Sequence, residues 1–232
     1  MPNWGEHLAV ANKLLKRIKV DENLFLFGNI LPDVQSGYLV KGISNIQPSD
    51  FNHFESKVEG GQWNFYNRKQ GYENFYEIYK DKLYNPMILG YLAHLMTDFS
   101  WNAIFYGERC IEKNGELVGY TDKNGKIIDG GFSKLRECKQ KEFMEFQNYI
   151  YQNYEMKLPE FSIDITKNAN LIEIININDE DVKKVVEYIK ETKNEAKDKE
   201  YQLKIFTIYE LEEQIDKTAE FIMNFLEKNG VK

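Results

Sequence analysis

The chain has 232 residues, 42% of them hydrophobic and 29% charged, and 30 Lys and Arg against 37 Asp and Glu give a formal net charge of −7. This composition excludes a fully disordered chain, and the lack of any 18-residue uncharged apolar stretch excludes a transmembrane helix. An acidic surface gains nothing from phosphate attraction, so we expect no stable nucleic-acid partner.

The first 30 residues are amphipathic and do not have the pattern of a secretory signal. Two cysteines, Cys110 and Cys138, are too few for a disulfide scaffold. We therefore expect a cytoplasmic protein with free thiols. The composition leaves the oligomeric state open.

Apolar residues recur at helical spacing along most of the chain. This periodicity predicts helices over residues 3–18, 62–84, 86–106, 133–155, 178–193 and 207–229. A capping residue followed three positions later by an acidic residue marks the start of three of them: Asn3 with Glu6, Asn178 with Asp181, and Thr207 with Glu210.

Three segments interrupt the helical pattern. After a short apolar run, Gly and Pro place Asp33 in a loop or at the end of an element. An Asn-Gly turn signal between apolar runs predicts a β-hairpin at 113–130, and residues 171–177 have a short strand-like pattern. We expect one all-α, mainly helical domain over residues 1–232, with a β-hairpin insertion near 113–130.

The segment 86–106 is apolar on nearly every side, which predicts a central buried helix. Its histidine and its carboxylate, His94 and Asp98, are four residues apart and so lie on one face. Gly90, one turn earlier, leaves space beside the histidine. Because burying an unpaired carboxylate is costly, these two side chains must pair with each other, pair with a Lys or Arg, or bind a metal.

The other candidate residues are uninformative one at a time. A lone histidine on an apolar helix face, such as His7, is more often a hydrogen-bonded core residue than a ligand. Asp33 is by itself more typical of a turn or cap. The chain has only three histidines, however, and the ordered set His7, Asp33, His53, His94 and Asp98 contains all of them.

That ordered set resembles the zinc-dependent phospholipase C family, a helical fold also used by the zinc-type single-strand nucleases. The matching segments are residues 6–11, 27–33, 52–54 and 89–98. The resemblance covers roughly residues 1–106. It implies a metal-dependent phosphoesterase that hydrolyses a phosphodiester or phosphomonoester of a small phospholipid-like or nucleotide-like substrate.

The resemblance also implies roles for the five side chains. Asp33, His53, His94 and Asp98 would gather one metal, and Asp98 would bridge to a second metal that His7 helps to hold. Asp33 would also be catalytic, by orienting or deprotonating the attacking water. Imidazole and carboxylate ligands suit one or two Zn²⁺ ions, and they also accept iron or manganese.

The sequence departs from the secreted bacterial members of that family. Trp4 is not N-terminal, no histidine follows His94, and Ile104 stands where the next one would be. Five carboxylates are candidates for a missing ligand: Glu6, Glu55, Glu108, Glu137 and Glu142. Five aromatic residues are candidates for a wall beside the metals: Trp4, Trp63, Tyr66, Tyr91 and Trp101.

Two alternatives to an enzyme remain at this point. The first is a non-catalytic metal-binding helical protein with a structural or sensing role, favoured by the lost histidines. The second has no metal, and in it His94 and Asp98 are only a hydrogen-bonded core pair.

Overall fold

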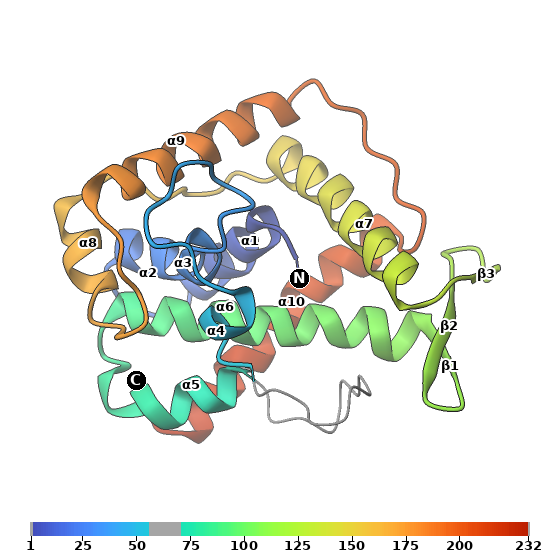
Figure 1. Ribbon diagram of the computed structural model, residues 1–232, viewed down its shortest axis with the longest axis horizontal. Coiled ribbons are helices and arrows are strands. Elements are labelled where there is room, and N and C mark those ends of the chain that lie inside the picture. The colour runs from blue at the N-terminus through green and yellow to red at the C-terminus, as the bar shows by residue number, and fades with distance from the viewer. Residues whose placement is uncertain (1, 56–70, 232) are drawn as a thin grey trace.

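The computed structural model describes residues 2–55 and 71–231, and the chain is mainly helical, as predicted (Figure 1). The α-helices are α1 (Trp4–Leu14), α2 (Glu22–Gly28), α3 (Leu31–Val34), α4 (Ser49–Asn52), α5 (Gly71–Tyr79), α6 (Pro86–Ala103), α7 (Phe132–Asn153), α8 (Ile163–Ala169), α9 (Asp179–Ala196) and α10 (Ile208–Lys228). A 3₁₀ turn, Lys80–Lys82, follows α5, and a π-helical segment, Ile104–Arg109, follows α6. None of the helices in the described ranges is long and apolar enough to span a membrane.

The central helix is α6, which runs across the middle of the molecule (Figure 1). Pro86 occupies its first turn, and the side chain of Asn85 caps it by accepting a hydrogen bond from the Met87 N–H at 2.9 Å. Every residue from Met87 to Asp98 is buried. Helices α1, α2, α5 and α10 all pack against α6, so the prediction of a buried central helix is confirmed.

Two glycines let the backbones of α2 and α6 approach closely. A Cβ on Gly90 would lie 2.3 Å from the Phe25 carbonyl oxygen, and a Cβ on Gly28 would lie 2.3 Å from the Met87 carbonyl oxygen. We expected Gly90 to leave open space beside His94, and this expectation is wrong. The α2 backbone fills that space, and this contact places α2 against the histidine's own turn of helix.

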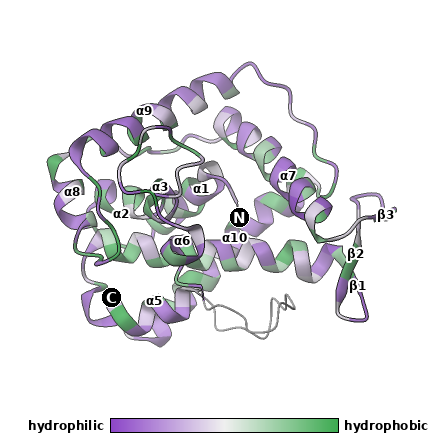
Figure 2. Cartoon of the chain, viewed as in Figure 1, coloured by the Kyte–Doolittle hydropathy of each residue, from purple (hydrophilic) through white to green (hydrophobic). Residues whose placement is uncertain are grey.

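The surface helices follow their amphipathic patterns. Figure 2 shows mostly hydrophilic residues along α9, whose buried apolar residues are Val182, Val185, Val186, Ile189 and Ala196. The capping boxes at Asn3, Asn178 and Thr207 are all present. The last helix ends before Gly230, which adopts a positive φ of 68°.

The β insertion is larger than the predicted hairpin. Strands β1 (Cys110–Lys113), β2 (Glu116–Thr121) and β3 (Ile127–Asp129) form an antiparallel sheet in the order β1-β2-β3. The first strand begins three residues before the predicted insertion, directly after the π-helical segment. Cys110 and Cys138 are both free thiols.

The predicted strand-like run at 171–177 is wrong. This segment contains no strand, because side chains satisfy its backbone in place of a strand partner. The Asn170 side chain bonds both the N–H and the carbonyl of Ile177, at 3.2 and 3.1 Å, and Gln35 does the same for Asn176 at 3.1 Å each. Of the helix predicted at 62–84, residues 71–79 form α5, and positions 62–70 lie outside the described residues.

Candidate metal centre

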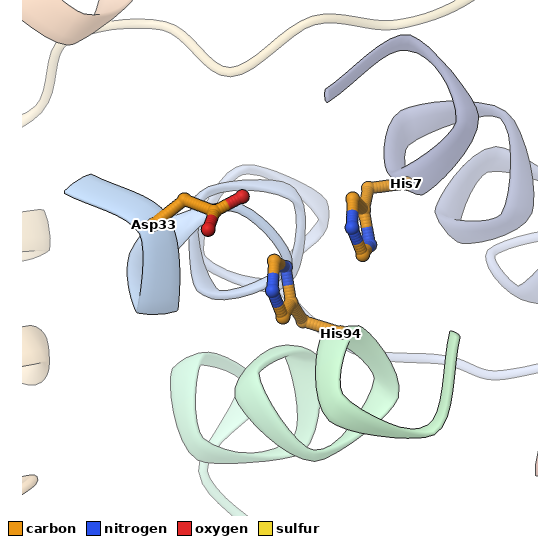
Figure 3. Close-up of side chains that lie close together, drawn as sticks. All are labelled: His7, Asp33 and His94. Atoms are coloured by element: carbon orange, nitrogen blue, oxygen red, sulfur yellow. The ribbon is translucent and has the colours of Figure 1, made fainter. Parts of the chain in front are cut away.

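Five buried side chains from separate parts of the chain lie together against α6. His7 comes from α1, Asp33 from α3, and His53 follows α4, while His94 and Asp98 come from α6 itself. Asp98 is the most accessible, at 7% exposure. Figure 3 shows the side chains of His7, Asp33 and His94 pointing toward one another from three helices. The structure thus brings together all five residues that the sequence singled out, with Asp33 in a one-turn helix and not in a loop.

Asp98 lies at the centre of the three histidines. Its carboxylate oxygens are 3.4 Å from His7 Nε2, 3.2 Å from His53 Nε2 and 3.5 Å from His94 Nε2. Neither oxygen has a hydrogen-bond partner, although both are buried. A buried carboxylate without such hydrogen bonds has lost its hydration and needs a compensating positive charge nearby, so this arrangement favours a bound cation.

Two of the histidines are oriented by backbone carbonyls. His94 Nδ1 lies 2.8 Å from the Asn29 carbonyl oxygen, and His53 Nδ1 lies 2.7 Å from the Ser49 carbonyl oxygen. A carbonyl can only accept, so each Nδ1 carries the proton and donates it. In the neutral ring each Nε2 then holds a lone pair, which is the tautomer of a metal-ligating histidine with its outer-shell partner in place.

The two lone-pair nitrogens face each other. His53 Nε2 and His94 Nε2 are 3.3 Å apart, and the His7 ring stacks on the His94 ring with centroids 3.9 Å apart and planes within 4°. Two neutral imidazoles with this tautomer repel at such a distance unless a proton or a metal ion lies between them.

Asp33 is held by two aromatic donors. The Trp4 indole N–H donates to Asp33 Oδ2 at 3.2 Å, and the Tyr38 hydroxyl donates to Asp33 Oδ1 at 3.2 Å. His53 Nε2 lies 3.5 Å from the same Oδ1. These contacts fix the carboxylate beside the histidines.

The cluster shifts the proton affinities of its members in opposite directions. Burial and the neighbouring His94 together lower the pKa of His7 to about 4, although Asp98 and Asp33 act to raise it. Burial also acts to lower the pKa of His53, but the close contact with Asp98 and the charges of Asp98 and Asp33 raise it to about 9. Burial acts to raise the pKa of Asp98, and the three surrounding histidines hold it well below its usual range.

These observations fit a metal site. Two triads have ligand atoms that all lie within 4.8 Å of one another: His7, Asp33 and His94, and then His53, His94 and Asp98. The donors are imidazole nitrogens and carboxylate oxygens, which suit zinc and its neighbours in the first transition series.

A family model of zinc-dependent phospholipase C matches residues 5–203. The chain belongs to this family. The match runs from α1 past the end of α9 and includes all five clustered residues. A search of curated proteins and a search of solved structures found no match. Membership in the zinc-dependent phospholipase C family indicates a metal-dependent phosphoesterase.

The structure separates the five carboxylates that were candidates for a missing ligand in this family. Glu142 accepts the backbone N–H groups of residues 204–206 at 2.8 to 3.0 Å, so it is structural. Glu6 is fully buried and accepts the Asn3 N–H at 3.1 Å, and burial raises its pKa well above the usual range. Glu108 and Glu137 are exposed. Glu55 lines the same cavity as Asp33.

The candidate aromatic wall is only partly present. Trp4 contacts Asp33, whereas Trp101 packs in the core against Phe143 and Phe146. Tyr91 is fully buried and donates to the Asn52 carbonyl at 2.5 Å. Positions 63 and 66 lie outside the described residues.

Two kinds of contact in the site have no signal in the sequence. Tyr38 follows Asp33 by five residues in a turn-rich segment, and no motif marks it as a partner. The backbone carbonyls of Asn29 and Ser49 have no residue-type signature, so no sequence pattern predicts them.

Proposed function

We propose that the protein is a zinc-dependent phosphoesterase that hydrolyses a phosphodiester or phosphomonoester of a small phospholipid-like or nucleotide-like substrate. The observation that carries the proposal is the Asp98 carboxylate, which is buried without hydrogen bonds among three histidine Nε2 atoms. Asp33, His53, His94 and Asp98 would hold one ion, and Asp98 with His7 would hold a second.

Zinc held by these residues would supply a Lewis acid for a phosphoryl oxygen and would lower the pKa of a water molecule to about 7. With Asp33 and Asp98 ionised, one divalent ion gives a neutral centre and two give a centre with about two positive charges. A centre with two ions would attract a phosphate anion despite the acidic surface of the protein.

A cavity of about 650 Å³ gives a substrate access to the cluster. Asp33 is in its wall together with Tyr38, Glu55 and Lys139. Asp33 is therefore the member of the cluster that lines this cavity. Trp4 and Tyr38 hold its carboxylate in one orientation, so that it can orient the attacking water or accept its proton.

Elemental analysis followed by a panel of phosphoesters tests the proposal. The purified protein, reloaded with zinc, should contain one or two ions and hydrolyse at least one ester, and iron- and manganese-loaded samples identify the preferred metal. His94→Ala should lose both metal and hydrolysis. Leu95→Ala is the matched control, because it removes a buried side chain from the same turn of α6 without removing a ligand.

Two results would contradict the proposal. Full metal content and full hydrolysis in His94→Ala would remove the histidine from the site. One tightly held ion in a wild-type protein that hydrolyses no ester would identify a non-catalytic metal-binding protein instead.

A further inference from the structure

The cavity that reaches Asp33 has two basic residues in another part of its wall. Arg136 and Lys139 both come from α7 and both line the cavity. They are three residues apart, so they lie on the same face of the helix. The proposed metal chemistry uses neither of them.

Lys139 is an unusual residue for a cavity wall, because its side chain is only 4% exposed. Its Nζ donates to the Asn102 side-chain oxygen at 2.6 Å and lies 4.4 Å from the centroid of the Tyr106 ring. Within residues 2–55 and 71–231, no ion pair joins it to a carboxylate. Burial, partly opposed by the charge of Asp98, lowers its pKa to about 8, so it is mainly protonated at neutral pH.

A buried ammonium group without a neighbouring carboxylate has lost its hydration and has no negative charge to compensate for that loss. Its amide and aromatic partners are neutral and offset only part of the lost hydration. An anion that enters the cavity can complete its coordination. Arg136 is exposed beside it and offers a planar guanidinium, which binds phosphate or carboxylate through two parallel hydrogen bonds.

The cavity also has acidic residues, and their position decides where an anion can bind. Asp50 and Glu55 belong to α4 and the residues that follow it, and both are exposed to water. Water screens their charges much more strongly than it screens the buried charge of Lys139. The two basic groups of the wall lie together on α7, and Asp33, the buried carboxylate of the wall, belongs to the metal cluster.

We propose that Lys139 and Arg136 form an anion subsite, and that the substrate has a second phosphate or carboxylate group in addition to the phosphate that is cleaved. This inference rests on the proposed function, because the first phosphate is the one bound at the metal centre. It narrows the substrate class from phosphoesters in general to esters with two anionic groups.

Three non-hydrolysable ligands with the same three-carbon chain test the subsite by calorimetric titration of the zinc-loaded protein. They are propylphosphonate, propane-1,3-diylbisphosphonate and 3-aminopropylphosphonate, which differ in the group at the far end: hydrogen, a phosphonate anion or an ammonium cation. We expect the bisphosphonate to bind at least about tenfold more tightly than propylphosphonate, as a charge-assisted contact provides, and the amino compound to bind most weakly. The zinc content is measured after each titration to exclude extraction of the metal.

Two variants and one control assign the effect to α7. Lys139→Met and Arg136→Gln should each reduce the preference for the bisphosphonate by about tenfold while retaining zinc. Arg136→Gln changes an exposed residue and is not expected to affect folding, so the test does not depend on the buried lysine. Lys141→Gln removes the same charge from an exposed position of α7 outside the cavity wall and should keep the full preference.

The outcomes separate this inference from the proposed function. A loss of preference in either variant, absent in Lys141→Gln, supports the subsite. Binding of propylphosphonate without any preference for the bisphosphonate overturns the subsite and leaves the phosphoesterase proposal standing, as does an unchanged preference in both variants. A zinc-loaded protein that binds none of the ligands and hydrolyses no ester overturns both.

Discussion

Substitution of Gly90 by alanine should disturb the metal centre, although residue 90 is not itself a metal ligand. The added Cβ would lie 2.3 Å from the Phe25 carbonyl oxygen and 3.0 Å from the Asn29 nitrogen, whereas ordinary contact begins at 3.4 Å. The α2 backbone must therefore withdraw by about 1 Å. The same movement lengthens the 2.8 Å bond from His94 Nδ1 to the Asn29 carbonyl beyond hydrogen-bond range.

Two quantities should change in Gly90→Ala. Overpacking between α2 and α6 should lower the free energy of unfolding by about 1–3 kcal/mol, measured by urea denaturation of the metal-free protein. Loss of the outer-shell partner of His94 should weaken zinc binding by about 10- to 100-fold, measured by competition with a chromophoric chelator.

A matched glycine provides the control for this experiment. A Cβ on Gly131 meets no atom within 4 Å, so Gly131→Ala should leave zinc affinity unchanged and alter stability by about 0.5 kcal/mol at most. Wild-type zinc affinity in Gly90→Ala would refute the reasoning, because it would show that the Asn29 carbonyl does not orient His94 for binding.

Asp98→Asn should reduce zinc content to less than half of the wild-type value by elemental analysis, and NMR titration should show the pKa of His53 falling from about 9 by about 1 unit or more. In the metal-free protein, the raised pKa of His53 contributes stability that is complete below about pH 6.5 and is lost as the pH rises through 9. The lowered pKa of His7 has the opposite effect: its contribution to stability is complete above about pH 6.5 and is lost as the pH falls through 4. These two groups should give a maximum of stability near pH 6.5 in urea titrations, and a monotonic profile between pH 4 and 9 would contradict their assignment. Zinc affinity should rise about tenfold per pH unit below pH 9, because the ion displaces the proton on His53. Trp4→Phe should retain zinc and lower kcat by about tenfold, since it removes a donor to Asp33, and an unchanged kcat would exclude a positioning role for the indole.

Local signals in the sequence were sufficient for much of the fold. The capping boxes at Asn3, Asn178 and Thr207 involve residues three positions apart, so they form as soon as each helix does. The all-round apolar character of residues 86–98 also predicted a buried helix, because it is a property of that segment's own side chains. The prediction failed at residues 171–177, where the backbone bonds to side chains of Asn170 and Gln35 and not to a strand. The prediction of one domain over residues 1–232 and that of a cytoplasmic location stay predictions.

The sequence by itself determined which five side chains form the cluster, because the chain has only three histidines and each falls in a segment that resembles the family. The tertiary structure decided how they meet. Asp98 lies among three imidazoles, two of them oriented by carbonyls of Asn29 and Ser49, and α7 places Lys139 in the cavity that reaches Asp33. These contacts join residues far apart in the chain, or use backbone atoms that every residue has, so only the packing of the helices determines them.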